Sequence, residues 1–396
     1  MTSAWPLYLA AAEAEYKKSL FREPNLFPHY SENGRWQLLG VESTSSWQGG
    51  TYEHGNWTAG FWFGEMWLTA LGRRDERFIQ PAKERLPLLA PRAQDATTHD
   101  LGFMFYPSLV LGYECGFLDA SEVEPALEAA RMTVRRFNEA GRYIQAFGPV
   151  GDARWAPTST VDTLMNLPLL WWAHGMTGEP RFLEVARQHA RTTARLMVRP
   201  DGSAIHLIRL DSITGAFTEE STFQGASAQS AWSRGLAWAV TGLAWGFAVT
   251  GEPEFLAVAE RAAGYYEQHA PLNRLPAWDF AASSADPLVD ASAAGIMALG
   301  YTILAEVHPE QDRAGHYAEG GRRLLETIGR EALNRDPAVD GLLLKSNYSV
   351  PHGRGVDGAT AWGDFFVGLA LALSERVVSL PQVLGARTIR DGMTSR

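Results

Sequence analysis

The stretch TGEPRFLEVARQHA at Thr177–Ala190 returns as TGEPEFLAVAERAA at Thr250–Ala263. Each copy follows an apolar segment rich in small residues, VDTLMNLPLLWWAHGM before the first and SAWSRGLAWAVTGLAWGFAV before the second. A Thr-Gly pair is typical of a helix end, and a proline shortly after it is favoured in the first turn of the next helix. The repeat therefore predicts a unit of one buried and one amphipathic helix, which must stack on neighbouring units to cover its apolar face.

The same alternation continues along the whole chain. Apolar helices are expected to begin near Trp57, Asp100, Val161, Trp232, Asp290 and Trp362. Amphipathic stretches lie between them, at residues 2–22, 75–90, 121–140, 181–198, 253–270 and 313–331. Helices that are apolar all round are buried, whereas one-sided helices face solvent. Six inner and six outer helices in alternation predict an all-α (α/α)6 barrel that forms a single domain over residues 1–396.

An open α-solenoid is the alternative architecture, although it needs polar capping repeats at both ends. Long segments without helical periodicity, at residues 23–56, 199–230 and 332–361, favour the barrel, because such loops in a compact domain usually carry function. No period-two pattern is long enough to predict a substantial sheet. QAF (145–147) and AIHLIRL (204–210) are expected to be short strands at the rim.

The composition limits the kinds of partner. A formal net charge of -10 disfavours a nucleic-acid or anionic-membrane surface, because both need clustered Lys and Arg. The single cysteine, Cys115, excludes an internal disulfide, and no Cys/His group has zinc-site spacing, so we expect no metal and no cofactor. The N-terminal segment lacks a basic run, and no apolar run reaches membrane-spanning length. We therefore expect a cytoplasmic protein that is a monomer or a weak homo-oligomer.

Polar and aromatic side chains gather where the predicted inner helices begin. They are His54, Trp57, His99, Asp100, Asp162, Trp232, Arg234, Asp290, Trp362 and Asp364. If the six inner helices run in the same direction, these ends meet at one mouth of the barrel. Helix N-termini also present free N–H groups and a positive dipole end, which favour an anionic ligand.

An aspartate at the start of a helix is most often an N-cap. We assign that role to Asp290 and leave it open for Asp364. Hydroxyl residues precede both Asp162 and Asp100 and can cap their helices, which would leave both carboxylates free. Two free carboxylates in one cavity couple, so that one holds a proton near neutral pH while the other stays ionised. The pair would thus supply a general acid.

Several segments follow one another in a recognisable order. They are NWTAGFWFGEMWL (56–68), HDLGFMFYPSLV (99–110), GRYIQAF (141–147), VDTLMNLPLLWWA (161–173), DGSAIH (201–206), TFQGASAQSAWSRGLAWAVTG (222–242) and WGDFF (362–366). In order and spacing they resemble the unsaturated glucuronyl hydrolases, glycoside hydrolase family 88, from about residue 50 to the C-terminal helix. The resemblance implies an (α/α)6 barrel, in agreement with the helix pattern.

The resemblance also implies roles for individual positions. Asp162 matches the family's acid/base carboxylate, and Asp100 matches its second essential carboxylate. The sugar site is implied at His99, Phe147, His206, Gln224, Arg234 and Trp238, with Trp57 and Phe61 in its aromatic wall. Core packing is the alternative role for the three residues Trp57, Phe61 and Trp238, and a structural ion pair is the alternative for Arg234. Phe147 stands where the family usually carries Trp, a difference that bears on the preference for the leaving sugar. Phe63 and Leu236 also differ from the family's usual residues, and neither difference touches the carboxylates.

The activity implied by the resemblance is hydration of 4,5-unsaturated uronic acid at the non-reducing end of oligosaccharides left by lyases. Asp162 would protonate C4 and then help to deprotonate the water that attacks C5, after which the hemiketal opens and releases the aglycone. Other interpretations stay open. They are an unsaturated rhamnogalacturonyl hydrolase, a sugar 2-epimerase that uses His99 and His206, and a non-catalytic oligosaccharide-binding protein.

Overall fold

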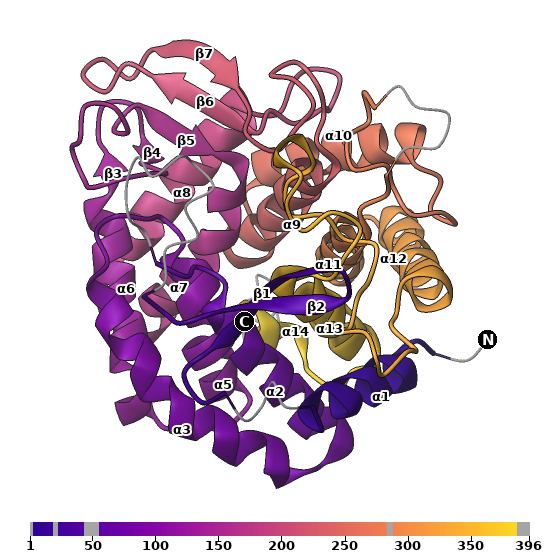
Figure 1. The fold of residues 1–396 in the computed structure, drawn as a ribbon. Helices are drawn as coiled ribbons and strands as arrows, with labels where there is room; N and C mark the ends of the chain where they lie inside the picture. The colour runs from indigo at the N-terminus through magenta and orange to yellow at the C-terminus, as the bar shows by residue number, and fades with distance from the viewer. Residues whose placement is uncertain (1–2, 19–22, 43–54, 283–287, 386–396) are drawn as a thin grey trace.

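The structure is a computed structural model that describes residues 3–18, 23–42, 55–282 and 288–385. Two concentric sets of helices account for most of it (Figure 1). The inner set consists of α2 (Ala59–Arg73), α4 (Leu101–Phe105) with α5 (Leu111–Glu114), α7 (Leu167–Thr177), α9 (Ser233–Thr250), α11 (Ala291–Val307) and α13 (Ala361–Ser374). The outer set consists of α1 (Trp5–Tyr16), α3 (Ile79–Leu89), α6 (Glu124–Arg135), α8 (Pro180–Leu196), α10 (Pro253–His269) and α12 (Gln311–Glu331). A short α14 (Leu380–Leu384) follows.

The inner helices form a closed ring. Helix α2 contacts α4, α4 contacts α7, α7 contacts α9, α9 contacts α11, α11 contacts α13, and α13 contacts α2 again. Every residue of α9 from Ser233 to Ala248 is buried, whereas only one side of α8 is. The closure excludes the open α-solenoid and confirms the all-α (α/α)6 barrel predicted from the sequence.

The repeated Thr-Gly-Glu-Pro motif ends two inner helices as predicted. Gly178 follows α7 and Gly251 follows α9, and both have a φ of 71°, in the left-handed region that glycine adopts without strain. Pro180 and Pro253 are the first residues of the outer helices α8 and α10. The motif therefore turns the chain from the inner layer to the outer layer in the same way twice.

Two inner helices are irregular near their N-terminal ends. A π-helical turn over Tyr106–Val110, which contains Pro107, separates α4 from α5. The segment Val161–Asn166 forms a 3-10 helix, η6, that leads into α7. Of the two predicted carboxylates, Asp162 lies within η6 and Asp100 immediately precedes α4.

A β-hairpin lies in the segment 23–56, which the sequence pattern predicted to be irregular. Strand β1 (Phe27–Glu32) pairs antiparallel with β2 (Arg35–Leu39) and crosses the face of the ring shown in Figure 1. The turn consists of Asn33 and Gly34, with φ values of 52° and 70°. Asn-Gly is the favoured pair for a two-residue hairpin turn, so the sequence held a signal that the periodicity analysis missed.

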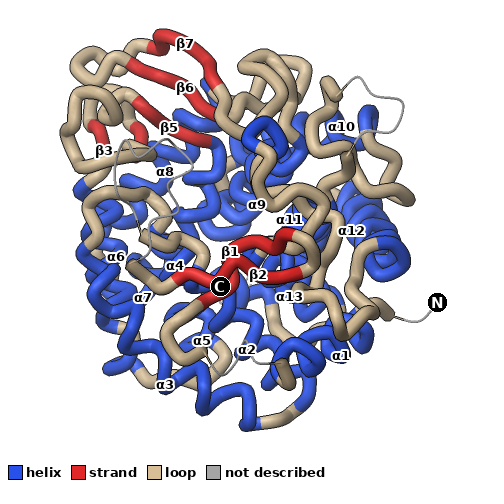
Figure 2. Tube along the Cα trace, viewed as in Figure 1, coloured by secondary structure: helices blue, strands red, loops and turns tan. Residues whose placement is uncertain are grey.

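The other strands lie at the rim of the barrel (Figure 2). Strands β5 (Thr158–Thr160), β6 (Leu207–Leu210) and β7 (Phe217–Ser221) form an antiparallel sheet, and β6 falls within the predicted strand AIHLIRL. The prediction of a strand at QAF (145–147) is wrong. The nearby strands are β3 (Phe137–Asn138) and β4 (Tyr143–Ile144), whereas the amides of Gln145 and Ala146 donate to two different segments instead of one ladder.

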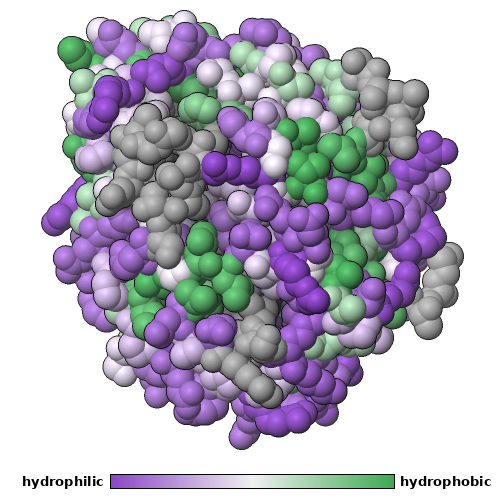
Figure 3. Space-filling model, in the orientation of Figure 1, coloured by the Kyte–Doolittle hydropathy of each residue, from purple (hydrophilic) through white to green (hydrophobic). Residues whose placement is uncertain are grey.

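The face of the barrel that carries the β1–β2 hairpin is mostly hydrophilic where described residues are visible, with hydrophobic side chains in small separate groups (Figure 3). None of the helices in the described ranges is long and apolar enough to cross a membrane.

Candidate active site

One pocket is lined by residues from the N-terminal ends of five of the six inner helices, all but α11. It encloses about 600 Å³ that no atom fills, part of it open to solvent. Its lining consists of Trp57, His99, Asp100, Phe103, Phe147, Asp162, His206, Phe223, Gln224, Trp232, Arg234, Trp238, Tyr348 and Trp362. All the predicted site residues except Phe61 are in this lining. His54, which was expected near the same mouth, lies outside the described residues.

The prediction that Phe61 forms part of the aromatic wall is wrong. Its side chain is fully buried on α2 and packs against Phe103 and two aromatic residues of α13, Phe365 and Phe366. Trp57, which precedes α2, stacks on Trp362, and both residues line the pocket. Core packing, the alternative role for Phe61, is the one observed.

Some lining residues were not predicted. Trp232 and Trp362 were noted only as the starts of inner helices, and Phe103 lies in the HDLGF segment that was quoted for Asp100. Phe223 is next to the predicted Gln224. Tyr348 comes from the long segment 332–361, where no periodicity indicates which side chains turn inward.

The two carboxylates meet because two inner helices approach closely. A Cβ atom added at Gly102 would lie 2.3 Å from the Cα of Asn166, so only glycine permits this contact. The amide of Phe103 also donates to Oδ1 of Asn166 at 2.9 Å. As a result, ligand-type atoms of His99, Asp100 and Asp162 all lie within 4.8 Å of one another.

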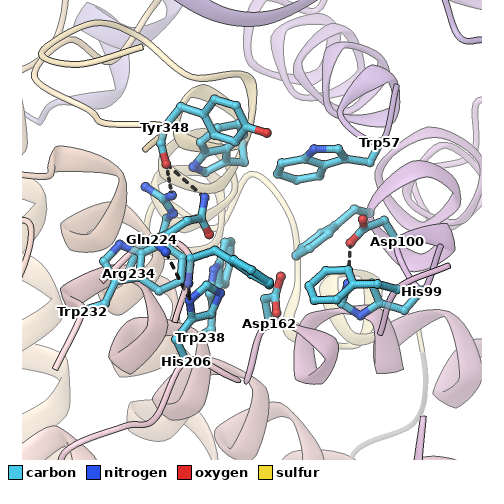
Figure 4. A pocket seen from close by; sticks show the side chains of 14 residues that line it. Trp57, His99, Asp100, Asp162, His206, Gln224, Trp232, Arg234, Trp238 and Tyr348 are labelled. Atoms are coloured by element: carbon cyan, nitrogen blue, oxygen red, sulfur yellow. Dashed lines mark hydrogen bonds and ion pairs between the residues drawn. The ribbon is translucent and has the colours of Figure 1, made fainter. Parts of the chain in front are cut away.

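Neither carboxylate caps its helix, although the predicted reason is wrong. No side chain caps the start of α4 or of η6. The hydroxyl of Thr98 instead donates to Oδ2 of Asp100 at 2.9 Å. Oδ1 of Asp162 is buried and has no hydrogen-bond partner in the described part of the chain. In Figure 4, Asp162 lies between Asp100 and His99 on one side and His206 and Trp238 on the other.

Burial raises the pKa of Asp162 above its usual value, and the nearby negative charge of Asp100 raises it further. Positive charge on His99 and a hydrogen bond from Thr160 act in the opposite direction. The net direction is upward, so the Asp162 carboxyl retains its proton at a higher pH than an exposed aspartate does. This direction favours Asp162, which lines the pocket, as a proton donor.

His99 connects the two helix starts. Its Nδ1 lies 2.7 Å from Oγ1 of Thr163, and its Nε2 lies 3.3 Å from Oδ1 of Asp100. His99, Asp100 and Asp162 form the only group in the described ranges whose atoms are close enough to hold a metal ion. Nδ1 of His99 is in a hydrogen bond with Thr163, and Nε2 lies against Asp100. We therefore interpret the three residues as an acid/base site.

His206 lies across the pocket from His99 and has a fixed proton position. Its Nδ1 accepts from Thr222 Oγ1 at 2.9 Å and from the amides of Phe223 and Gln224 at 3.2 and 3.4 Å. Because a backbone N–H can only donate, Nδ1 of His206 must be the acceptor, and the proton of the neutral ring is on Nε2. Burial and the charge of Arg234 lower the pKa of His206 to about 3. His206 is thus a neutral hydrogen-bond donor near pH 7.

Arg234 is on the pocket wall and is also held in a structural ion pair. Its Nη1 donates to Oδ2 of Asp290 at 2.9 Å and to the carbonyl of Asn347, and its Nη2 donates to the carbonyl of Tyr348 at 2.8 Å. The guanidinium also lies over the ring of Trp232, with 4.4 Å to the ring centroid. Gln224 donates to the same Tyr348 carbonyl at 3.0 Å, as Figure 4 shows.

We expect Arg234→Ala to lower the free energy of unfolding by about 3–5 kcal/mol, because the substitution leaves Asp290 buried without its partner. Thermal and denaturant unfolding of the variant and of Arg234→Lys, which keeps the charge, would measure the effect. An Arg234→Ala protein with unchanged stability and reduced turnover would show that Arg234 acts mainly on the substrate.

The other two aspartates at inner-helix starts have structural contacts. Asp290 is the N-cap of α11 and accepts from the amide of Ser292 at 3.0 Å, which confirms the predicted role. Asp364 lies in the first turn of α13, which Thr360 caps. Its carboxylate accepts from the amides of Leu342 and Leu343 at 2.7 and 2.8 Å, so Asp364 anchors the 332–361 segment.

The chain is similar in sequence and in structure to known hydrolases of unsaturated sugars. No family model matches the chain. The chain is 30% identical to an unsaturated glucuronyl hydrolase of Formosa agariphila over 82% of its own length and 81% of the relative. It is 31% identical to an unsaturated chondroitin disaccharide hydrolase of Streptococcus pyogenes over 78% and 79% of the two chains. The crystal structure of the unsaturated glucuronyl hydrolase of Bacillus sp. GL1 matches with a TM-score of 0.85 and 28% identity, and the match covers 94% of this chain and 97% of that one.

Proposed function

Because the chain belongs to the unsaturated glucuronyl hydrolase family and is a glycosidase that hydrolyses unsaturated uronates, we propose that it acts by hydrating the C4=C5 bond of a 4,5-unsaturated uronic acid. The proposed substrate carries this sugar at the non-reducing end of an oligosaccharide made by a lyase. The observation that carries the proposal is the buried carboxyl of Asp162, with its raised pKa and with Asp100 beside it.

In the proposed reaction, the Asp162 carboxyl donates its proton to C4 of the vinyl ether. The positive charge that develops is shared between C5 and the ring oxygen, as in other glycosidase transition states. Asp162, now ionised, accepts a proton from the water that adds to C5. The resulting hemiketal opens, which leaves a ketone at C5 and a hemiacetal at C1, and this hemiacetal releases the aglycone with its glycosidic oxygen.

The other site residues are proposed to support this step. Asp100 keeps a negative charge next to Asp162 and so helps it to retain the proton. His206 offers an N–H, while Trp57 and Trp238 provide flat apolar faces for a sugar ring. Phe147, which meets Phe223 and Trp155 at edge-to-face angles, is proposed to contact the leaving sugar.

We also propose that residues 1–396 act as a single catalytic domain. Helix α1, near the N-terminus, packs against α2 and against α13, near the C-terminal end of the described chain. Removing either end would therefore expose the apolar side of the ring, which is consistent with one cooperative unit.

A sugar 2-epimerase has less support from the geometry. It would need His99 and His206 as a central acid and base near neutral pH. The pKa of His206, about 3, makes that residue a poor proton acceptor there, and Nδ1 of each histidine is already in a hydrogen bond. An unsaturated rhamnogalacturonyl hydrolase would use the same chemistry, and it differs only in the sugar attached to the unsaturated uronate.

We expect the protein to abolish the ultraviolet absorbance of unsaturated glucuronyl disaccharides and to do so after exhaustive chelation, since no step above requires a metal. The assay would follow absorbance and released sugar together, on glucuronyl and rhamnogalacturonyl substrates. Preference for the latter would reassign the substrate, and binding without turnover would support an oligosaccharide-binding protein. Activity that is lost on chelation and restored by one divalent ion would contradict the metal-free mechanism.

A further inference from the structure

A buried arginine holds backbone carbonyls from two segments of the chain next to the pocket. Arg136 follows α6 directly and is 2% exposed. Its Nε donates to the carbonyl of Gln145 at 2.9 Å, and its Nη2 donates to the carbonyls of Ala146 and Gly148, both at 3.1 Å. Its Nη1 donates to the carbonyl of Ala96 at 2.6 Å. One side chain thus connects two segments that are far apart in the sequence.

Phe147, which lines the pocket, lies within one of these segments. Three of the four carbonyls that the arginine holds belong to Gln145, Ala146 and Gly148, on both sides of Phe147. The side chain of Gln145 is 4% exposed, and its Nε2 donates to the carbonyl of Phe147 at 2.7 Å and to that of Pro149 at 2.8 Å. Two buried side chains therefore hold the backbone that carries the Phe147 ring.

The fourth carbonyl belongs to the segment that leads to a candidate catalytic carboxylate. Ala96 lies a few residues before Asp100 in the sequence. Between them, Thr98 forms an isolated antiparallel bridge with Phe147. Arg136 therefore connects the backbone around Phe147 with the backbone that leads to Asp100.

We propose that Arg136 and Gln145 are positioning residues that set where Phe147 stands relative to the carboxylates, and with it the place of the leaving sugar. This inference rests on the proposed function, in which Phe147 contacts that sugar. A guanidinium has several N–H donors in a fixed planar fork and can hold several carbonyls at once, whereas a lysine donates from a single atom. Because proton transfer to C4 does not involve Phe147, the two residues act on binding of the leaving sugar.

The test compares two substrates that differ only in the group released, an unsaturated glucuronyl disaccharide and the methyl glycoside of the same unsaturated sugar. Arg136→Lys keeps the buried charge but not the planar fork. We expect its kcat/KM on the disaccharide to fall about three- to tenfold, through KM and with little change in kcat. The methyl glycoside should be turned over as by the wild type. Gln145→Leu should give the same pattern, and it decides if Arg136→Lys does not fold.

Two controls separate this role from a general loss of stability. In a Phe147→Ala background, adding Arg136→Lys should cause no further loss on the disaccharide, because the two changes act through one contact. Thr241→Val removes a different buried hydrogen bond to a carbonyl, that of Ile296 at 2.7 Å, between α9 and α11. It should leave the kinetics on both substrates unchanged.

Several results would overturn the inference. They are unchanged kinetics in both positioning variants, an equal loss on the two substrates, and a full additional loss in the Phe147→Ala background. Failure of both variants to fold would show a purely structural role. Calorimetric binding of the two compounds in the Asp162→Asn background repeats the comparison without turnover. A wild type that turns over neither compound, with the same difference in binding, would refute the proposed function and leave the role of Arg136 standing. Binding of neither compound would refute both.

Discussion

Asp162→Asn is expected to reduce kcat on an unsaturated disaccharide by about 10²- to 10⁴-fold, the contribution typical of a general acid. Asparagine keeps the volume of the side chain but cannot give a proton to C4. Because Oδ1 of Asp162 has no partner in the described part of the protein, the substitution breaks no hydrogen bond at that atom. We therefore expect the variant to fold and to bind substrate.

The measurement combines steady-state kinetics with calorimetric binding of the intact disaccharide to Asp162→Asn. Preserved affinity with lost turnover would assign the loss to the chemical step. Near-normal turnover would remove Asp162 from the mechanism. A variant that neither binds nor shows a normal thermal transition would show a structural role for this carboxyl instead.

Asp100→Asn is expected to shift the pH dependence as well as the rate. The charge of Asp100 is one of the causes that raise the pKa of Asp162, second to burial among those causes. Removing it lowers that pKa, and Asp162 must be protonated to act as the acid. The limb on which kcat/KM falls with rising pH should therefore move to lower pH.

A pH–rate profile of the wild type and of Asp100→Asn would measure this shift. The limb should move down and not up, because a lowered pKa means that Asp162 loses its proton earlier as the pH rises. A slow Asp100→Asn enzyme with an unshifted limb would reduce Asp100 to a role in orientation. It would also imply that burial alone keeps the proton on Asp162.

The sequence was sufficient to predict the barrel, because the alternation of apolar and amphipathic helices repeats along the chain. The repeated Thr-Gly-Glu-Pro motif and six apolar helices record which surfaces are buried, and the ring closes as that pattern requires. The β1–β2 hairpin was missed because it depends on one local turn at Asn33 and Gly34. Periodicity does not report such a turn.

The site was predicted mostly through motifs, and the exceptions have physical causes. Phe61 and Trp57 lie in the same segment, but only Trp57 precedes the helix and reaches the pocket. Tyr348 enters from a long loop without periodicity. The contact between Thr163 and His99 depends on the close approach at Gly102, which cannot be inferred without the three-dimensional arrangement of the helices.

The central claim is that the enzyme hydrates a double bond and that release of the sugar follows from this hydration. The most direct measurement uses an unsaturated glucuronyl disaccharide analogue in which a methylene group replaces the glycosidic oxygen. Such a compound cannot be hydrolysed at C1, yet its C4=C5 bond is intact. We expect the enzyme to abolish its ultraviolet absorbance, and Asp162→Asn to leave the absorbance unchanged. An enzyme that cleaves the natural disaccharide but binds the analogue with its double bond untouched would contradict the account.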